Sequence, residues 1–206
     1  MFLNINQQLA RCERVIRQRV RPHIHRTIEP LSIEAFDIPG EPMPATDFFV
    51  HESKGDVPFQ PFAVGSVWGT TWGTTWFRLR GKLPMGYPKS KPLELSIDLG
   101  WLDHSVGGHV EGMVYRSDGT VLKALHPRNR WVPFIDADGT CHMAIGNDGM
   151  FTVYVEAACN PLILGITTFD ETGLGIMPLE NLRRNMYSEP LNLLNTMNAS
   201  KNTTWI

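Results

Sequence analysis

Two groups of side chains in this sequence are of the kinds that bind carbohydrate. Flat aromatic rings stack on sugar rings, and a few placed polar groups hydrogen-bond to the hydroxyls. The aromatic candidates are Trp68, Trp72, Trp101 and Trp131. The polar candidates are the consecutive residues Arg128, Asn129 and Arg130. Together they make a carbohydrate-binding module one hypothesis for the chain.

Trp68, Trp72 and Trp76 recur every four residues in the segment Trp-Gly-Thr-Thr-Trp-Gly-Thr-Thr-Trp-Phe. On a helix this spacing would form a stripe, but glycine and β-branched threonine disfavour a helix. In an extended segment the same spacing places all three rings on one side. The rings then either cover the end of a hydrophobic core or form an exposed platform for sugar. Packing is favoured, because large exposed apolar patches are rare outside partner surfaces.

Residue types that serve in metal sites and hydrolytic sites also occur, but without the spacing that such sites need. His23 and His25 place two imidazoles on one side of a strand. No third ligand follows at a short interval, which favours surface histidines over a metal site. Asp103, His104 and Ser105 are the three residue types of a hydrolytic triad. Because triad members converge from distant segments, this adjacent run indicates a turn.

Acidic residues suitable for glycoside cleavage are present, but no pattern pairs them. Such cleavage uses two carboxylates about 5 to 10 Å apart across the scissile bond. The available acids include Asp98, Asp103, Glu111 and Glu156. The sequence also contains neither a phosphate-binding glycine-rich loop nor a paired-cysteine metal motif. We therefore expect no catalytic residue, metal or other cofactor in this chain.

The scaffold that positions these residues is predicted by a period of two from residue 74 to about 169. Apolar residues alternate with polar ones in the runs 77–83, 93–99, 141–145 and 151–155. Turn sequences with Asn or Asp before Gly occur at 118–119, 138–139 and 147–149. No helical period intervenes between the runs. The pattern predicts a mainly β domain over 66–170, built as an antiparallel β-sandwich or jelly roll.

The segments before this domain have other patterns. Within residues 1–25, apolar side chains three and four apart predict an amphipathic helix over 4–20. Its other face carries several arginines, which we interpret as a solvated face of a helix docked to another domain rather than a nucleic-acid contact. The proline-rich stretch 26–65 predicts an extended wrap around a body.

The tail 171–206 predicts short helical segments. Apolar residues at helical spacing indicate one helix around 179–186 and the start of another around 191–197. The chain stops before the second helix could bury its apolar stripe, which predicts a truncated tail.

Composition and charge restrict the partners and the compartment. A formal net charge of −2 provides no global field for nucleic acid. No apolar run approaches the roughly 20 residues that span a bilayer, and the first residues lack the pattern of a signal peptide. Cys12, Cys141 and Cys159 are widely spaced and odd in number, which argues against a disulfide framework. We expect a cytoplasmic protein without nucleic-acid or membrane partners.

A series of motifs follows in order along the chain. They are Pro61-Phe-Ala-Val-Gly, the tryptophan segment from Trp68, Gly81-Lys-Leu-Pro, Ile97-Asp-Leu-Gly, Glu111-Gly-Met-Val-Tyr-Arg-Ser-Asp-Gly-Thr, Pro127-Arg-Asn-Arg-Trp-Val-Pro and Val155-Glu-Ala-Ala-Cys-Asn-Pro. In this order, from about residue 9 to 170, the chain resembles the N-terminal region of α-mannosidases of glycoside hydrolase family 38, of the bacterial cytoplasmic type. The resemblance implies a galactose-binding-domain-like jelly roll that precedes a catalytic barrel.

Members of that family cleave α-mannosides through an Asp nucleophile and a zinc ion held by His and Asp residues. The His-x-Asp motif that opens their catalytic region is absent from this sequence, so the resemblance assigns no catalytic or zinc-binding residue here. It implies that zinc, or another divalent metal, belongs to a catalytic domain outside the chain. The leading hypothesis is a structural domain that contacts the catalytic domain or other protomers and is inactive alone. The alternative is a carbohydrate-binding module for an α-mannoside or oligosaccharide.

Overall fold

The computed structural model describes residues 4–20, 25–88, 90–101, 110–126, 129–160 and 193–200, the last of these as backbone alone. Most of the described elements are strands, as the alternating pattern predicts. The helical elements are α1 (Ile5–Val15), the π-helical turn η1 (Ile16–Val20) and α3 (Ala45–Lys54). The strands are β1 (His25–Pro30), β2 (Ser32–Asp37), β3 (Gln60–Phe62), β4 (Thr74–Lys82), β5 (Leu93–Leu99), β6 (Val110–Arg116), β7 (Val121–Leu125), β8 (Trp131–Ile135), β9 (Met150–Cys159) and β10 (Leu193–Ser200).

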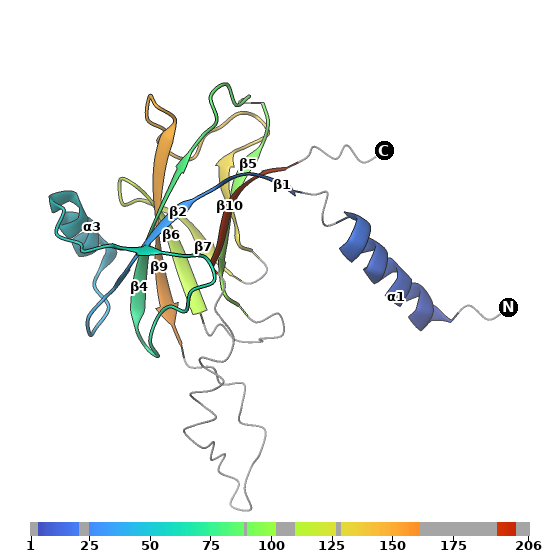
Figure 1. Cartoon of the computed structure of the whole chain (residues 1–206), viewed down its shortest axis with the longest axis horizontal. Coiled ribbons are helices and arrows are strands. Elements are labelled where there is room, and N and C mark those ends of the chain that lie inside the picture. Colours follow the sequence, from blue (N-terminus) through green and yellow to red (C-terminus); the bar gives the residue numbers. More distant parts are fainter. Residues whose placement is uncertain are drawn as a thin grey trace, which may run out of the picture.

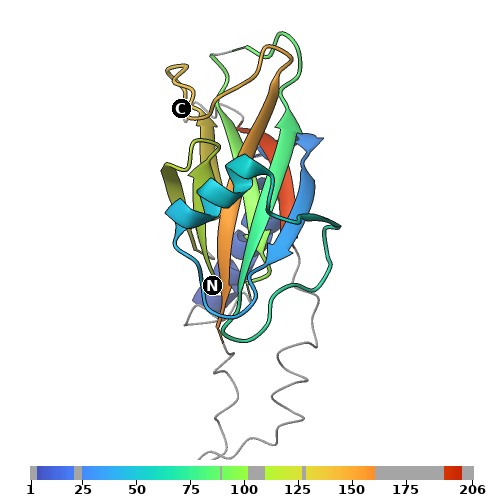
Figure 2. The same ribbon diagram turned by 90° about the vertical axis from the view of Figure 1, so that its left-hand side faces the viewer.

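The strands form two sheets that pack face to face (Figures 1 and 2). One sheet has the strand order β1-β10-β5-β8, and the other has the order β3-β2-β4-β9-β6-β7. Neighbouring strands pair antiparallel in both sheets. The predicted antiparallel β-sandwich is therefore confirmed. Consecutive strands often belong to different sheets, so the chain crosses repeatedly between the layers, as in a jelly roll.

The main core lies between the two sheets. In β4, Phe77 and Leu79 are fully buried in this core, while Arg78 between them lies on the opposite face. β5 repeats the alternation with its fully buried side chains Leu93, Leu95, Ile97 and Leu99. Burial of one such side chain contributes about 1.5–3 kcal/mol before the loss of conformational entropy. The period of two in the sequence thus correctly predicts which side chains of β4 and β5 face the main core.

A second hydrophobic cluster lies on the outer face of the six-stranded sheet, where α3 covers it (Figure 2). Trp76 of β4 stacks on Phe48 of α3 with ring centroids 3.6 Å apart and an interplanar angle of 7°. Both side chains are fully buried. We call this group the α3 cluster; its buried members are Ile38, Phe48, Trp76, Tyr115 and Tyr154.

The stretch 26–65, which the prolines predict to be an extended wrap, also contains regular structure. β2 lies inside the six-stranded sheet between β3 and β4. α3 begins after Pro44, carries Asp47 in its first turn and ends at Gly55, whose φ of 76° is left-handed. An acidic first turn and a left-handed glycine at the C-terminus are ordinary helix-end signals. The prolines on both sides of α3 hide these helix-end signals in the sequence, because prolines predict extended or turn structure.

The spacing at 191–197 predicts a helix, but this prediction is wrong because Leu193–Ser200 forms β10. β10 pairs with β5 on one side and with β1 on the other. Pairing along both edges satisfies its backbone groups, and this tertiary context overrides a weak local spacing. The helix predicted at 179–186 lies outside the described residues.

The alternation at 141–145 predicts a strand, and this prediction is also wrong. The stretch is a loop with one isolated bridge, between Ile135 and Cys141. Its backbone is held by single hydrogen bonds instead of a ladder: His142 N donates to Phe134 O at 2.9 Å, and Arg116 Nε donates to His142 O at 2.6 Å. Cys141 is exposed, so it does not pack as a small hydrophobe.

α1 stands apart from the two sheets (Figure 1), and none of its residues is buried. The side chain of Asn4 caps it by accepting from Asn6 N at 3.2 Å and Gln7 N at 3.4 Å. The helix predicted over 4–20 is confirmed, with its last turn π-helical. Among the described residues, no helix is long and apolar enough to cross a membrane.

Candidate functional site

Strand register brings most of the candidate binding residues to one end of the sandwich, where β5 and β9 end and β6 and β8 begin. Val110 at the start of β6 pairs with Cys159 at the end of β9. Near the end of β5, Ile97 N donates to Arg130 O at 3.0 Å. We call this the tryptophan end; it lies at the bottom of Figure 1. From the predicted set it holds Trp68, Trp72, Trp101, Asn129, Arg130 and Trp131, while Arg128 lies outside the described residues.

Trp68 closes the main core at the tryptophan end. Its side chain is only 4% exposed, and its ring meets Phe77 edge-on at 5.3 Å. Its Nε1 donates to Leu99 O at 3.2 Å. Position 69 requires glycine, because its φ is 74° and an added Cβ would lie 3.1 Å from the Cβ of Cys159. The packing prediction is confirmed for Trp68, which leaves no exposed face of this ring for stacking on a sugar.

Trp68, Trp72 and Trp76 do not lie on one side of the chain, so that prediction is wrong. Trp68 belongs to the main core, whereas Trp76 belongs to the α3 cluster on the other face of the six-stranded sheet. The chain leaves the extended conformation in a turn where Gly73 N donates to Thr70 O at 2.7 Å. A Cβ on Gly73 would lie 2.5 Å from Thr70 Oγ1. The turn changes the face to which the third ring points.

Trp72 is the exposed member of the three. Its side chain is 73% exposed, and its φ of 64° is in the left-handed region that a bulky residue rarely adopts. Trp72 N donates to Cys159 O at 2.7 Å, and Cys159 N donates to Gly73 O at 3.0 Å, so the turn is tied to the end of β9. Val64 and Val67 in the same loop are about half exposed. Backbone strain that holds an apolar ring in water is typical of functional sites.

Trp101 and Trp131 are half-buried at the same end. Trp101 packs against the main core, and its Nε1 donates to Val110 O at 2.8 Å. The backbone oxygen of Trp131 accepts from Lys123 Nζ. Each of these two residues retains some exposed surface, but both are also held by contacts within the fold.

The polar candidates are held by contacts within the fold as well. Arg130 forms an ion pair with Asp98, whose Oδ1 also accepts from Gly100 N at 2.9 Å. Asn129 is exposed, and its backbone N donates to His126 O at 2.7 Å, which closes the turn between β7 and β8. The charge of Arg130 is therefore already paired, whereas the side chain of Asn129 faces solvent.

A pocket of about 240 Å³ lies near the tryptophan end, at the β3 edge of the six-stranded sheet. Its lining includes Phe36, Asp37, Gln60, Phe62, Trp68 and Thr75. Thr75 is buried, and its hydroxyl donates to Asp37 Oδ1. Apart from Trp68, sequence reasoning missed this pocket. Its residues come from four separate stretches of the chain, and their types do not form a motif. The pairing of β2 with β3 and β4 brings three of these stretches together.

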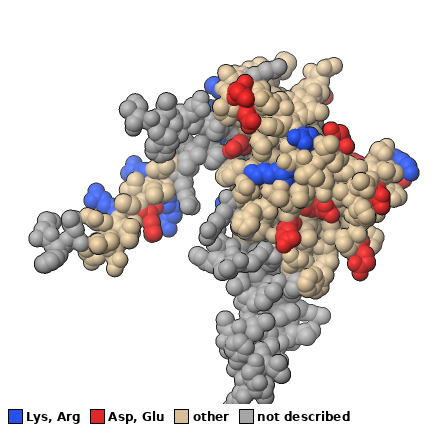
Figure 3. All heavy atoms as spheres, turned by 180° about the vertical axis from the view of Figure 1, so that it is seen from behind, with Lys and Arg blue, Asp and Glu red and all other residues tan. Residues whose placement is uncertain are grey.

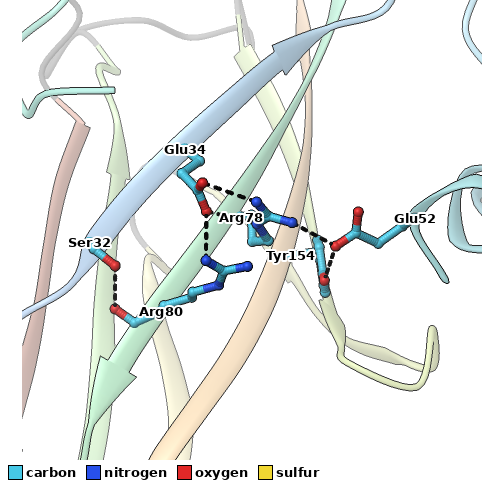
Figure 4. Close-up of polar contacts among 6 residues, drawn as sticks. All are labelled: Ser32, Glu34, Glu52, Arg78, Arg80 and Tyr154. Atoms are coloured by element: carbon cyan, nitrogen blue, oxygen red, sulfur yellow. Dashed lines mark hydrogen bonds and ion pairs between the residues drawn. The ribbon is translucent and has the colours of Figure 1, made fainter. Parts of the chain in front are cut away.

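A polar network on the outer face of the six-stranded sheet holds α3 in place (Figure 4). Arg78 donates to both oxygens of Glu34, from Nε at 2.8 Å and from Nη2 at 3.0 Å. Its Nη1 donates to Glu52 Oε1 of α3 at 2.9 Å, and the same oxygen accepts from the Tyr154 hydroxyl at 2.6 Å. Arg80 Nη1 adds an ion pair with Glu34 at 3.2 Å. The network joins β2, β4, β9 and α3.

Contacts within this network shift the pKa of Glu34 and of Tyr154, and each shift favours the protonation state that the hydrogen bonds need. The hydrogen bond from Arg78 lowers the pKa of Glu34, so the carboxylate is charged at neutral pH. Burial and then the hydrogen bond to Glu52 raise the pKa of Tyr154, which keeps its hydroxyl a donor. The guanidinium of Arg78 also lies 4.2 Å from the centroid of the Phe59 ring. The arrangement stabilises the fold, and none of these groups lines the pocket.

The comparison with known families agrees with this architecture. A family model described as the α-mannosidase jelly roll domain matches residues 29–183 of the 206-residue chain. The chain belongs to this family. The match includes β2 through β9, so both the sandwich and the resemblance seen in the motifs are confirmed. A search of curated proteins found no match to the chain.

The carboxylates of this α-mannosidase jelly roll domain have partners within the fold or are exposed. Glu156 Oε2 accepts from the Tyr115 hydroxyl at 2.8 Å, Asp98 is paired with Arg130, and Glu111 is exposed. Among the described residues, no three His, Cys, Asp or Glu side chains gather to hold a metal ion. These residues do not fit the zinc centre that the family resemblance implies for a catalytic domain. His23 and the run Asp103, His104 and Ser105 lie outside the described residues.

Charge is scattered over the face of the jelly roll domain seen in Figure 3. Lys and Arg side chains of the described residues lie among Asp and Glu side chains and do not gather into a continuous basic surface on this face.

Proposed function

We propose that this jelly roll domain is a non-catalytic docking module of an α-mannosidase, and that its tryptophan end contacts the catalytic part of that enzyme. The observation that carries the proposal is Trp72, an exposed aromatic ring held by a strained backbone turn. In this account the domain is inactive alone, and zinc or another divalent metal belongs to the catalytic part.

The chemistry around Trp72 fits a protein partner. Tryptophan is the residue type most enriched among the side chains that carry binding energy, and such rings insert into pockets surrounded by apolar contacts. Val64 and Val67, each about half exposed in the same loop, supply that apolar surround. A partner that covers this loop would remove the ring from water and would use a conformation already ordered by its hydrogen bonds to Cys159.

The N-terminal helix offers a second contact to the same partner. Its apolar residues are exposed along α1 and η1, namely Ile5, Leu9, Val15, Ile16 and Val20. An amphipathic helix gains most of its stability by packing its apolar face. We propose that the catalytic part, or a second protomer of the same enzyme, covers this face while the arginines stay in solvent.

A binding assay between two purified proteins tests the proposal. The full chain is titrated into the separately produced catalytic part of an α-mannosidase by isothermal calorimetry. We expect saturable binding, and at least a 30-fold weaker Kd for Trp72→Ala, since loss of an anchoring tryptophan costs about 2 kcal/mol or more. Met85→Ala is the matched control, because Met85 is 98% exposed outside this loop. Equal affinity of the wild type, Trp72→Ala and Met85→Ala would contradict the proposal.

Inactivity of the isolated domain is tested by an aryl α-mannoside assay. We expect no product release from the purified chain, with or without added zinc or cobalt, because no three His, Cys, Asp or Glu side chains of the described residues gather to hold a metal ion. Metal-dependent turnover by the clean chain would contradict a docking role without catalysis.

A carbohydrate-binding module is the second candidate function, and one observation favours it. The tryptophan end brings Trp72, Trp101, Trp131, Asn129 and Arg130 together from distant segments. Their rings and polar groups would contact an α-mannoside or oligosaccharide, together with Arg128, which directly precedes Asn129 in the same run. Titration with mannose and manno-oligosaccharides, followed by tryptophan fluorescence, tests this function. A flat titration at millimolar sugar would rule against it.

A further inference from the structure

The pocket beside β3 combines aromatic, amide and carboxylate surface in about 240 Å³. Phe62 supplies an aromatic wall and is anchored edge-on against Phe77 of the main core at 5.4 Å, whereas Phe36 borders the pocket but packs with the α3 cluster on the other face of the sheet. Gln60 supplies an amide, whose Nε2 donates to Pro58 O at 3.3 Å. The volume is smaller than the roughly 300–1,000 Å³ of drug-sized sites, which suits a single small ring.

Asp37 gives the pocket a fixed, charged acceptor. One carboxylate oxygen accepts from the buried hydroxyl of Thr75, while the residue as a whole remains exposed. An ionised carboxylate has about four acceptor positions on its two oxygens, so acceptor capacity beyond the Thr75 bond faces the pocket. Hydrogen bonds from a ligand to this group would be charge-assisted and about twice as strong as neutral ones.

The pocket is built on rigid backbone at a sheet edge. β3 pairs with β2 from Ile33 to Ala35, and the pocket opens where Phe36 and Asp37 continue β2 past that pairing. Two prolines, Pro58 and Pro61, form part of the rim and restrict its backbone. A preformed rim lowers the ordering cost of binding a small ligand.

The Asp37 carboxylate decides which ligands the pocket disfavours. A purely apolar ligand is disfavoured, because it would desolvate this carboxylate without a hydrogen bond. A cation would pair with the same carboxylate, and competition with n-butylammonium separates that kind of ligand from a sugar.

We propose that this pocket binds one pyranose ring, with two adjacent hydroxyls donating to Asp37 and the C–H face of the ring against Phe62. The pocket would give the domain a monosaccharide subsite distinct from Trp101, Trp131 and Asn129. It goes beyond the docking role and does not depend on Trp72.

A nuclear magnetic resonance titration of the full chain with methyl α-D-mannopyranoside tests the proposal. We expect saturable amide shifts at the pocket residues and a Kd of roughly 1–10 mM, a range that suits a single shallow subsite. Trp72→Ala should bind the sugar with the same Kd as the wild type. That result separates the pocket from the docking proposal, because the same variant should bind the catalytic part of the enzyme at least 30-fold more weakly.

Two variants test the assigned contacts. Asp37→Asn keeps an acceptor for Thr75 but removes the charge, and should weaken Kd at least tenfold. Asp56→Asn is the control, because Asp56 is an exposed acid outside the pocket and should leave Kd unchanged. Phe62→Leu keeps an apolar side chain against Phe77 and should weaken Kd several-fold. Near-ultraviolet circular dichroism shows whether each variant is folded. If Asp37→Asn unfolds, the affinity of Phe62→Leu carries the test.

Three outcomes would overturn the proposal. The first is the absence of saturable shifts up to about 100 mM sugar, well above the expected range. The second is wild-type affinity in both Asp37→Asn and Phe62→Leu. The third is n-butylammonium that shifts the same amides and competes with the sugar, since this result would identify a pocket for a cation.

Discussion

Trp72 and Trp76 are each preceded by Gly-Thr-Thr, yet they lie in opposite surroundings. Trp72 is 73% exposed in a strained turn, whereas Trp76 is fully buried and stacked on Phe48 of α3. The three preceding residues are the same, so they do not decide the burial of either ring. What differs is the cover, because α3 lies over Trp76 and no described segment lies over Trp72.

The same comparison separates a region that stabilises the domain from one that is available to a partner. Around Trp76, ring contacts and the network of Arg78 with Glu34 and Glu52 leave little polar or apolar surface unmatched. One buried donor, Trp76 Nε1, lacks a partner among the described residues. Around Trp72, strain and exposure remain uncompensated within the described residues. This difference is the basis for proposing that the docking surface lies at the tryptophan end.

Trp76→Ala should cause the largest effect, because it empties the centre of the α3 cluster. We expect a loss of about 3–5 kcal/mol in the free energy of unfolding, measured by urea denaturation. Trp72→Ala is the matched control and should change it by no more than about 0.5 kcal/mol, since the ring is exposed. Similar losses in the two variants would break the comparison.

Arg78→Met should cause the next largest effect, because it leaves Glu34 and Glu52 charged without their shared partner. Their side chains are 25% and 13% exposed, so we expect a loss of about 2–3 kcal/mol, below the cost for fully buried pairs. Urea denaturation measures it. The control Arg80→Met removes a 42% exposed side chain and should cost less than about 1 kcal/mol. An equal cost for both would mean that the network does not hold α3.

Acidification should weaken the α3 side of the molecule through Glu34. Its folded pKa lies below the ordinary glutamate value of 4.5, so its contribution is present above that pH and is lost as pH falls through the folded pKa. We expect Glu34→Gln to lose stability at pH 7 by less than about 1 kcal/mol and to depend less on pH below 4.5 than the wild type. Thermal unfolding from pH 7 to pH 3 measures this. Glu41→Gln, at an exposed acid, should keep the wild-type profile.

Trp72→Asn should have the smallest effect, and in the opposite direction. Asparagine tolerates the left-handed conformation better than tryptophan, so part of the backbone strain at a φ of 64° is relieved. We expect a gain of about 0.5 kcal/mol in urea denaturation. A loss of stability would show that the ring itself holds the turn, and would remove the argument that the strain serves a partner.

The sandwich was predictable because its strands are amphipathic. Leu93, Leu95, Ile97 and Leu99 recur with a period of two, and each is fully buried. The helix α3 was harder to predict, because it is ten residues long and buries only Phe48, so its apolar face is too narrow to give a clear helical period. The strand β10 was not predictable from spacing, since its pairing with β5 and β1 is a tertiary property.

The candidate site was predictable only in part. The aromatic and polar residues chosen from the sequence gather at one end of the sandwich, but the sequence did not show which of their rings are exposed. Trp68 is buried and Trp72 is exposed because the chain turns between Thr70 and Gly73. The four-residue spacing of the tryptophans does not show this turn. The pocket at Asp37 was missed because its lining depends on strand register. Exposure and register are set by the whole fold, which local patterns do not contain.

Fluorine nuclear magnetic resonance of the chain labelled with 5-fluorotryptophan tests the central claim most directly. The Trp72 and Trp76 signals are assigned by replacing each residue with phenylalanine, and the catalytic part of an α-mannosidase is then added. The account predicts that the Trp72 signal shifts as this exposed ring becomes covered, while the Trp76 signal, already under α3, stays in place. An unchanged Trp72 signal at saturating catalytic part would contradict the docking role.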